Sequence, residues 1–501
     1  MATPAIGELR YSIEEPSALD RYVVDFVAET LGLVPVEATG PAARPILYWG
    51  NGSEGSSTES PPGAGASAVG GIRVPRREGD TIWADLLDGR LDQDAVAPEV
   101  PFDVLGAIGR LLTDRVHDGV SADGRDAHGR LRFAASFQAR HGYGDVPIVN
   151  CYVDLLRGLV RRQLGLVGQP LWPPGKRAAI GLSHDVDRPC KWGLLRALSH
   201  GQWPRGGRRL AWFLGKSGKI AFDRLRAGGR DDFWLFEPIM AAEQERGFRS
   251  TFMFAPTPSF GRGGTRWDVD YDIGWSGFEP LFRAIAEDGF EVGLHAGYSA
   301  CSDGRRFVDE RRSLADRSGA AVTGLRHHFW HLGPDEGRTL RMHEEAGFAY
   351  DSSIAFNDEL GFRRSVALPF RPWDPTLGRS LRTLQLPTFC MDGNLFHRRS
   401  EPGLAIGRVA RFLDRIKTQG GLGVIDWHVR TSLPANREFR DWGRAYLGIL
   451  DLLAADPGLW VTGLGEIDAW LEARRAALRD VPLPAGVGPS MLPAEAFGMR
   501  E

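Results

Sequence analysis

The sequence predicts an α/β protein: a distorted TIM-like (β/α)7 barrel of parallel strands, preceded by an N-terminal mixed α/β domain. From Ala178 onward, short apolar segments alternate with amphipathic helical patterns, which is typical of βα units on a parallel sheet. No Gly-x-Gly-x-x-Gly follows the first apolar segment, which disfavours a dinucleotide-binding fold. Polar side chains of catalytic type end several of the segments, as expected at the mouth of a barrel. The candidate strands begin near Ala178, Arg249, Phe290, Ala321, Phe348, Leu381, Leu422 and Leu459.

Bulk composition narrows the class of protein. The chain has 501 residues, of which 43% are apolar and 25% charged, so we expect at least two globular domains with a sizeable core. Its net charge of -3 gives no general attraction to nucleic acid. We find neither a secretory signal nor a long uncharged apolar stretch, so we expect a cytoplasmic protein. The four cysteines lie far apart, which favours neither a disulfide scaffold nor a thiolate zinc site.

The first and last parts of the chain differ in composition from the middle. Residues 1–172 form the expected N-terminal domain, whose role the sequence leaves open. A Gly/Ser-rich stretch near 50–71 predicts a flexible loop within it. Residues 173–475 form the expected barrel, and the Pro-rich residues 476–501 form a surface tail.

A basic helical insertion is predicted near 193–240 of the barrel. Its segment 203–230 carries many arginines and lysines against the single acid Asp223, with aromatic residues interleaved. One interpretation is a solvated basic face. The other is peripheral contact with an anionic membrane surface, a lipid carrier or an acidic polymer.

Two helices of the barrel illustrate the pattern. After Ser276, one apolar stripe is formed by Phe278, Leu281, Phe282 and Ile285. We expect Ser276 and Glu279 to form a capping box at its start and Gly289 to end it. A second helix has its stripe at Ile406, Val409, Leu413 and Ile416, and Gly420-Gly421 is expected to end it.

Two carboxylates end the first barrel strand. Ser183-His184-Asp185-Val186-Asp187 follows the buried apolar run that begins at Ala178. Residues two apart on a strand lie on the same side of it, so Asp185 and Asp187 are expected to face the same site. One could bind a metal ion while the other serves as a base.

Other strands end in residues of complementary chemistry. The third strand ends in His295, the fourth in Arg326-His327-His328, the fifth near Asp351 and the seventh in His428. Because the carboxyl ends of barrel strands share one face, we expect these side chains to gather there. Together they could supply nitrogen and oxygen ligands for a divalent cation, plus an acid and a base.

As a set, these residues resemble the polysaccharide deacetylases of carbohydrate esterase family four, over roughly residues 178–430. The resemblance implies that Asp185 is the catalytic base and that Arg326 orients it. It implies one divalent metal ion, expected to be zinc, with Asp187 and His295 among its ligands. His428 matches the general acid of the family, and Asp351 matches a further motif that would tune His428.

One position departs from the family pattern. The second metal histidine of the family falls at Ser299, four residues after His295, and a serine hydroxyl is a poor substitute. We expect His328 to complete the metal site, because it follows a strand that faces the same mouth. His327 and His184 are less favoured candidates.

The resemblance also implies the reaction. The expected activity is hydrolysis of an N-acetyl or O-acetyl group on a sugar or oligosaccharide, either free or lipid-linked, from the synthesis of surface polysaccharide or glycolipid. A backbone N–H near Tyr298 would help to stabilise the oxyanion. Trp275, Trp330 and Trp373 are candidates for a floor under the sugar rings.

Two alternatives remain open at this point. A catalytically degenerate barrel that binds carbohydrate or a partner protein is supported by Ser299. A glycoside hydrolase would use two carboxylates, but Asp185 and Asp187 on one strand end would flank a bond less naturally than carboxylates from separate strands. A serine hydrolase is disfavoured because no Gly-x-Ser-x-Gly follows a strand.

Overall fold

The structure is a computed structural model. It describes residues 7–38, 47–51, 71–79, 81–191, 231–259, 261, 263–396 and 401–479. The basic segment 203–230 lies outside the described residues, as do nearly all of the Gly/Ser-rich loop and the tail beyond Arg479. Among the helices that can be described, none has both the length and the apolar composition of a membrane span.

The barrel is a single curled sheet in which every pairing between neighbouring strands is parallel. The strand order is β12-β9-β8-β7-β6-β5-β14-β13, and β15 pairs with the start of β5. This is the α/β, TIM-like architecture that the sequence predicts. The strands are β5 (Ala178–Val186), β6 (Thr251–Phe254), β7 (Glu291–Ala296), β8 (Gly324–His327), β9 (Tyr350–Asp351), β12 (Leu384–Gln385), β13 (Thr388–Met391), β14 (Leu422–Asp426) and β15 (Leu459–Thr462).

One stretch of chain joins the two edges of this sheet. β12 pairs with β9, and β13, which follows after two residues, pairs with β14. The stretch 384–391 therefore lies between β9 and β14 and closes the sheet on itself. Counting it as one strand gives a ring of seven strands, with β15 added outside the ring on β5.

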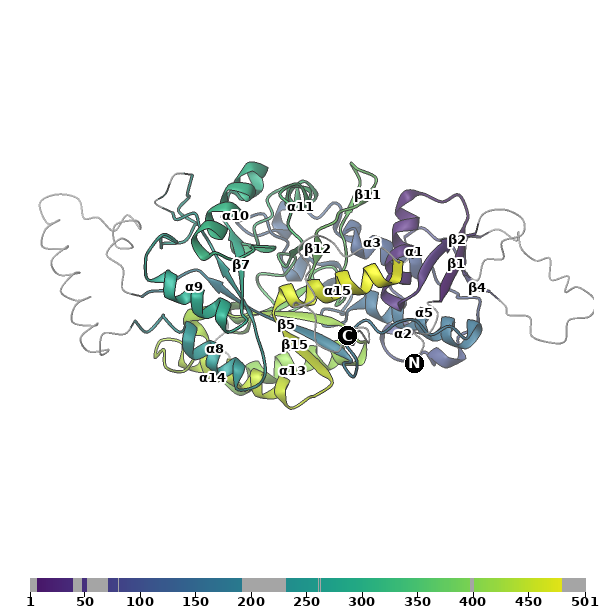
Figure 1. Cartoon of the computed structure of the whole chain (residues 1–501). Helices are drawn as coiled ribbons and strands as arrows, with labels where there is room; N and C mark the ends of the chain where they lie inside the picture. The colour runs from purple at the N-terminus through teal and green to yellow at the C-terminus, as the bar shows by residue number, and fades with distance from the viewer. Residues whose placement is uncertain are drawn as a thin grey trace, which may run out of the picture.

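The barrel helices cover the outer face of the sheet, as Figure 1 shows for α8, α9, α13 and α14. The expected helix after Ser276 forms, but the capping box does not. Gly277 is the N-cap residue of α9, and no side chain caps the helix. The helices are α8 (Phe236–Gln244), α9 (Phe278–Glu287), α10 (Gly304–Ser318), α11 (Glu336–Glu345), α12 (Asp392–Phe396), α13 (Pro402–Thr418), α14 (Arg440–Ala454) and α15 (Leu464–Arg479).

The N-terminal region is built around a second parallel sheet, with strand order β2-β1-β3-β4. It lies at the opposite end of the molecule from α8 and α9 (Figure 1). The elements are β1 (Glu8–Ile13), α1 (Ala18–Leu31), β2 (Val34–Glu37), β3 (Leu47–Trp49), β4 (Ile72–Val74), α2 (Ala84–Leu87), α3 (Val104–Leu112), α4 (Phe137–Arg140) and α5 (Ile148–Leu164).

This N-terminal region packs on the barrel through a shared core. The hydrophobic cluster that contains α1, α3 and α5 continues into barrel residues such as Leu340 and Leu368. A small antiparallel pair, β10 (Trp373–Asp374) and β11 (Arg379–Ser380), lies beside α1. Helix α15 also connects the two parts, because the buried guanidinium of Arg474 donates to the carbonyls of Glu29, Gln169 and Pro170.

Candidate metal centre

Successive side chains of β5 point alternately into the barrel interior and towards the surrounding helices. The Ser183 hydroxyl and the Asp185 carboxylate both contact Arg326, and Asp187 lies just beyond the strand end on the same side. His184 lies on the other side, where its Nε2 is 2.8 Å from Glu243 Oε1. This alternation follows from the strand geometry and places His184 away from the site.

Asp187, His295 and His328 form a candidate metal centre. Each offers one ligand atom, and these atoms lie within 4.8 Å of one another. Asp187 Oδ1 is 3.3 Å from His295 Nε2 and 3.4 Å from His328 Nε2. The three residues come from the ends of β5, β7 and β8; β7 and β8 are adjacent in the sheet, and β6 separates β7 from β5.

The polar atoms of this cluster fit a bound cation. Asp187 Oδ1 and His295 Nε2 are buried and have no hydrogen-bond partner. His295 Nδ1 lies 3.2 Å from the carbonyl oxygen of Arg326, which can only accept, so Nδ1 carries the proton and Nε2 keeps its lone pair. A carboxylate with two imidazoles is a donor set typical of zinc and related divalent ions.

The other histidines near the strand ends have different partners. His327 Nε2 is 2.8 Å from His343 Nε2, behind the β8 strand. Ser299, four residues after His295, accepts a hydrogen bond from Arg306. Of His328, His327 and His184, His328 is therefore the one that lies with Asp187 and His295.

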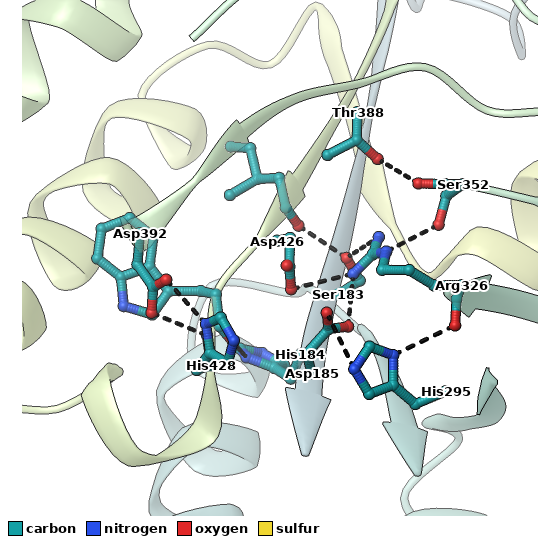
Figure 2. Close-up of polar contacts among 12 residues, drawn as sticks. Ser183, His184, Asp185, His295, Arg326, Ser352, Thr388, Asp392, Asp426 and His428 are labelled. Atoms are coloured by element: carbon teal, nitrogen blue, oxygen red, sulfur yellow. Dashed lines mark hydrogen bonds and ion pairs between the residues drawn. The ribbon is translucent and has the colours of Figure 1, made fainter. Parts of the chain in front are cut away.

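Arg326 organises the carboxylates beside the metal centre (Figure 2). This fully buried guanidinium contacts Asp185 Oδ1 at 2.9 Å and Asp426 Oδ1 at 3.0 Å. It also donates to the hydroxyls of Ser183 and Ser352, at 2.8 and 3.0 Å. Asp185 is thus held rigidly, with its second oxygen 3.7 Å from His295 Nε2.

The two carboxylates that share Arg326 differ in their pKa. Burial raises the pKa of Asp426 well above its usual value, and the nearby negative charge of Asp185 raises it further. For Asp185, burial is outweighed by His295 and Arg326, so its pKa is lowered. Asp185 is consequently the ionised member of the pair and Asp426 the member that favours the neutral form.

His428 lies between two carboxylates. Its Nε2 is 2.9 Å from Asp187 Oδ2. Its Nδ1 is 2.8 Å from Asp392 Oδ1, on the other side of the ring, as Figure 2 shows. Burial alone would lower the pKa of His428, but the charges of Asp392 and Asp187 outweigh it and hold the pKa well above the usual value. The imidazolium form is therefore favoured, as a proton donor requires.

Asp351 does not make the contact with His428 that the sequence interpretation gave it. Its carboxylate bonds to Ser353 and lies 3.5 Å from His343 Nδ1. Asp392, at the start of α12, occupies that place beside His428. Sequence reasoning missed Asp392 and also Asp426, although both stand at the carboxyl ends of strands, β13 and β14, which was the usable signal.

Two further expectations differ from the structure. The backbone N–H of Tyr298 donates to Asp268 Oδ1 at 2.7 Å, so it is already engaged and is not a free oxyanion donor. Trp330 is 6% exposed and packs beneath the Arg326 guanidinium, 5.2 Å from the ring centre, rather than forming an open floor. Trp275 is half exposed and packs against Trp234; these two residues lie just before α9 and α8.

No protein-family model matches this chain, and no curated protein does either. Solved structures similar to it include the "putative polysaccharide deacetylase from Mycobacterium smegmatis", with 18% identity and a TM-score of 0.40 over 64% of this chain and 96% of that one. PuuE allantoinase has 16% identity and a TM-score of 0.40, over 63% and 96%. A CE4 family pseudoenzyme from Bacillus anthracis has 11% identity and a TM-score of 0.30, over 59% and 66%. All three similarities are weak.

Proposed function

We propose that this protein is a metal-dependent hydrolase that removes an acetyl group from an N-acetylated or O-acetylated sugar. The observation that carries the proposal is the grouping at one barrel mouth of a cation-binding cluster, an ionised carboxylate and an imidazolium. Each of the three is fixed by a buried partner. This is the set of groups that metal-assisted hydrolysis of an acyl group needs.

Asp187, His295 and His328 would hold the metal ion, and zinc suits their donor atoms best. A divalent ion held there supplies polarisation of the acyl carbonyl and a lowered pKa of water. The Oδ1 atom of Asp187 faces the two histidine ligands, and its Oδ2 atom faces His428. It therefore connects the metal centre to the proton donor.

The proton steps are assigned to Asp185 and His428. Asp185 accepts a proton from the water whose oxygen attacks the acyl carbon, and Arg326 holds the carboxylate ionised and in place. As the bond between the acyl carbon and the leaving nitrogen breaks, His428 donates its proton to that nitrogen. The products are acetate and an amino sugar, or a free hydroxyl where the substrate is an O-acetyl ester.

The substrate class follows from the sequence rather than from contacts in the structure. We infer an N-acetylated sugar or oligosaccharide, either free or lipid-linked, that is an intermediate of surface polysaccharide or glycolipid synthesis in the cytoplasm. The basic segment 203–230 supports a lipid-linked substrate by its charge alone, since an anionic carrier or membrane surface would attract it.

Metal content is the first test. The full chain is purified without added metal, and bound metal and acetate release are measured beside Asp187→Ala, His328→Ala and Ser299→Ala variants. We expect about one divalent ion per chain in the wild type and Ser299→Ala, and none in the two ligand variants. If His328→Ala retained the metal, His328 would not be a metal ligand.

Turnover separates this proposal from its rivals. Acetate release that also disappears in Asp185→Asn, with metal retained, supports the hydrolase. Carbohydrate binding without bound metal or turnover would identify a degenerate binding module, for which Ser299 bonded to Arg306 is the supporting observation. Reducing sugar without free acetate would identify a glycoside hydrolase.

A further inference from the structure

A hairpin of the N-terminal region lies on the mouth of the barrel. Arg125 and Leu131 form an antiparallel bridge, and the N–H of Asp126 donates to the Arg130 carbonyl at 2.9 Å. The Asp126 carboxylate pairs with the Arg130 guanidinium at 2.6 Å, which fixes that side chain at the turn. We call residues 125–132 the mouth hairpin.

The mouth hairpin contacts the loops that follow four neighbouring barrel strands. The His128 ring lies 5.0 Å from the ring of Trp267, in the loop after β6. Its Nδ1 is 2.9 Å from the hydroxyl of Tyr298, in the loop after β7. It also lies 5.1 Å from the ring of Phe329, after β8. Arg130 donates to Asn357 Oδ1 at 2.8 Å, after β9.

The loop after β8 has an unusual backbone where the hairpin holds it. Phe329 has φ 61° and ψ 13°, and Trp330 has φ 53°, so two consecutive aromatic residues adopt the left-handed region. That region is strained for bulky residues and persists only where the surroundings fix it. Arg130 donates directly to the Phe329 carbonyl, and its side chain is mostly buried.

This strained turn begins directly after His328, and Tyr298 lies three residues after His295. Two of the four loops that the hairpin contacts therefore continue directly from candidate metal ligands. The centroid of the His328 ring also lies 4.8 Å from that of the His295 ring and 4.7 Å from that of the Phe329 ring. A shift of the Phe329 carbonyl would move His328 with it.

We propose that the mouth hairpin positions the metal ligands, with Arg130 and His128 as positioning residues supplied by the N-terminal region. Arg130 fixes the turn that orients His328, and His128 fixes the loop that follows His295. The proposal rests on the metal centre proposed above and gives the N-terminal region a part in it. It does not require that the metal serve deacetylation.

The test compares Arg130→Ala with Arg132→Ala in the full chain. Arg132 is an exposed arginine of the same hairpin whose Nε donates to the Arg125 carbonyl, so its loss leaves the barrel contacts in place. Zinc affinity of the metal-free protein is measured by calorimetry, and the ligand field of bound Co²⁺ by its visible spectrum. Loss of a residue that orients a ligand typically weakens metal binding about 10- to 100-fold. We expect that loss, with a changed cobalt spectrum, in Arg130→Ala only.

Amide hydrogen exchange gives a readout that needs no metal. We expect faster exchange in residues 328–332 of Arg130→Ala, with unchanged exchange in β5 as evidence that the barrel is folded. His128→Ala should accelerate exchange around Tyr298, and His128→Phe should restore part of the protection because it keeps the ring contacts. Wild-type zinc affinity together with wild-type exchange in Arg130→Ala would overturn the proposal. A wild-type protein that binds no metal would refute the proposed metal centre. In that case, unchanged amide exchange in residues 328–332 of Arg130→Ala would also refute the positioning role of the hairpin.

Discussion

Arg326 shows how one buried charge can serve several neighbours. It is fully buried and pairs with two carboxylates, and its remaining donors bond to serine hydroxyls. A buried ion pair contributes little net stability, but removal of one partner leaves an uncompensated charge that costs about 3–5 kcal/mol. The arrangement is therefore better explained by the fixed position it gives Asp185 than by stability.

Asp392 should control the pH range in which His428 can donate a proton. The raised pKa of His428 depends on carboxylate charge, and Asp392 gives the largest such effect. We expect Asp392→Asn to lower kcat at least about tenfold, because the proton donor is less populated and less well oriented. Since the acid form exists below the pKa, activity falls as pH rises through it. The alkaline limb of the kcat profile should therefore move to lower pH in the variant.

The control for this prediction is Asp351→Asn. Asp351 contacts Ser353 and His343 rather than His428, so its removal should leave the alkaline limb in place even if stability falls. An alkaline limb that moves in Asp351→Asn and stays in Asp392→Asn would reverse the assignment.

At the scale of elements, β5 and β8 determine the geometry of the site. β5 is buried along its whole length, and β8 along all four residues, so both lie inside the barrel with helices outside. Gly324 starts β8 directly against the buried ring of Tyr350. A Cβ built on Gly324 would lie 1.8 Å from Tyr350 Cζ.

Gly324→Ala should therefore destabilise the barrel. We expect a loss of about 1–3 kcal/mol in the free energy of unfolding, because the Tyr350 ring must move and its hydroxyl bonds to Glu291 at 2.8 Å. Gly407→Ala is the matched control, since nothing lies within 4 Å of a Cβ at this exposed position of α13. It should be neutral or more stable by up to about 1 kcal/mol. Urea denaturation of both variants measures the difference, and equal midpoints would contradict the prediction.

Much of the element order was predictable from the sequence. Each predicted strand begins within about three residues of an observed one, because strands buried on both faces give continuous apolar runs bounded by helical patterns. The division of 384–391 into β12 and β13 was not predictable, since it depends on which strand each half meets. The missing capping box reflects the same limit: Ser276 and Glu279 have the right spacing, but the helix begins at Phe278 with Gly277 as its N-cap residue.

The candidate site was predictable where strand ends alone determine position. Six of the predicted residues lie together at one mouth of the barrel: Asp185, Asp187, His295, Arg326, His328 and His428. Asp351 and Asp392 both follow strands, and only the three-dimensional register decides which one reaches His428. The engagement of the Tyr298 backbone N–H could not be predicted, because its acceptor, Asp268, lies in a different loop that no strand pattern places.

At the scale of the whole molecule, the N-terminal region and the barrel are one packing unit. Barrel side chains that belong to the N-terminal core are Leu332, Leu340, Ile354, Val366, Leu368, Phe370 and Leu381, all nearly buried. Each such side chain contributes about 1.5–3 kcal/mol when fully buried. The barrel therefore depends on the N-terminal region for part of its apolar coverage.

Deletion of residues 1–164 should leave a barrel that does not fold stably. We expect aggregation, or binding of a hydrophobic dye with loss of near-UV circular dichroism, because the apolar face would be open to water. The full chain prepared in parallel should show neither. A truncated protein with a cooperative urea transition like that of the full chain would show that the barrel is independent.

The connectivity of β5 also has a consequence for the order of events during synthesis. β14 pairs along one edge of β5, and β15 pairs along the start of the other edge. The Ser183 hydroxyl donates to the carbonyl of Ile425, a residue 242 positions further along the chain. β6 pairs with the Asp185 end of β5 and is translated soon after it, but a nascent chain must emerge almost completely before β5 has all of its neighbours. Until then that strand keeps an open, apolar edge, and contacts so distant in sequence form slowly. In the cell, this protein should be most prone to aggregation in the interval between translation of β5 and translation of β15.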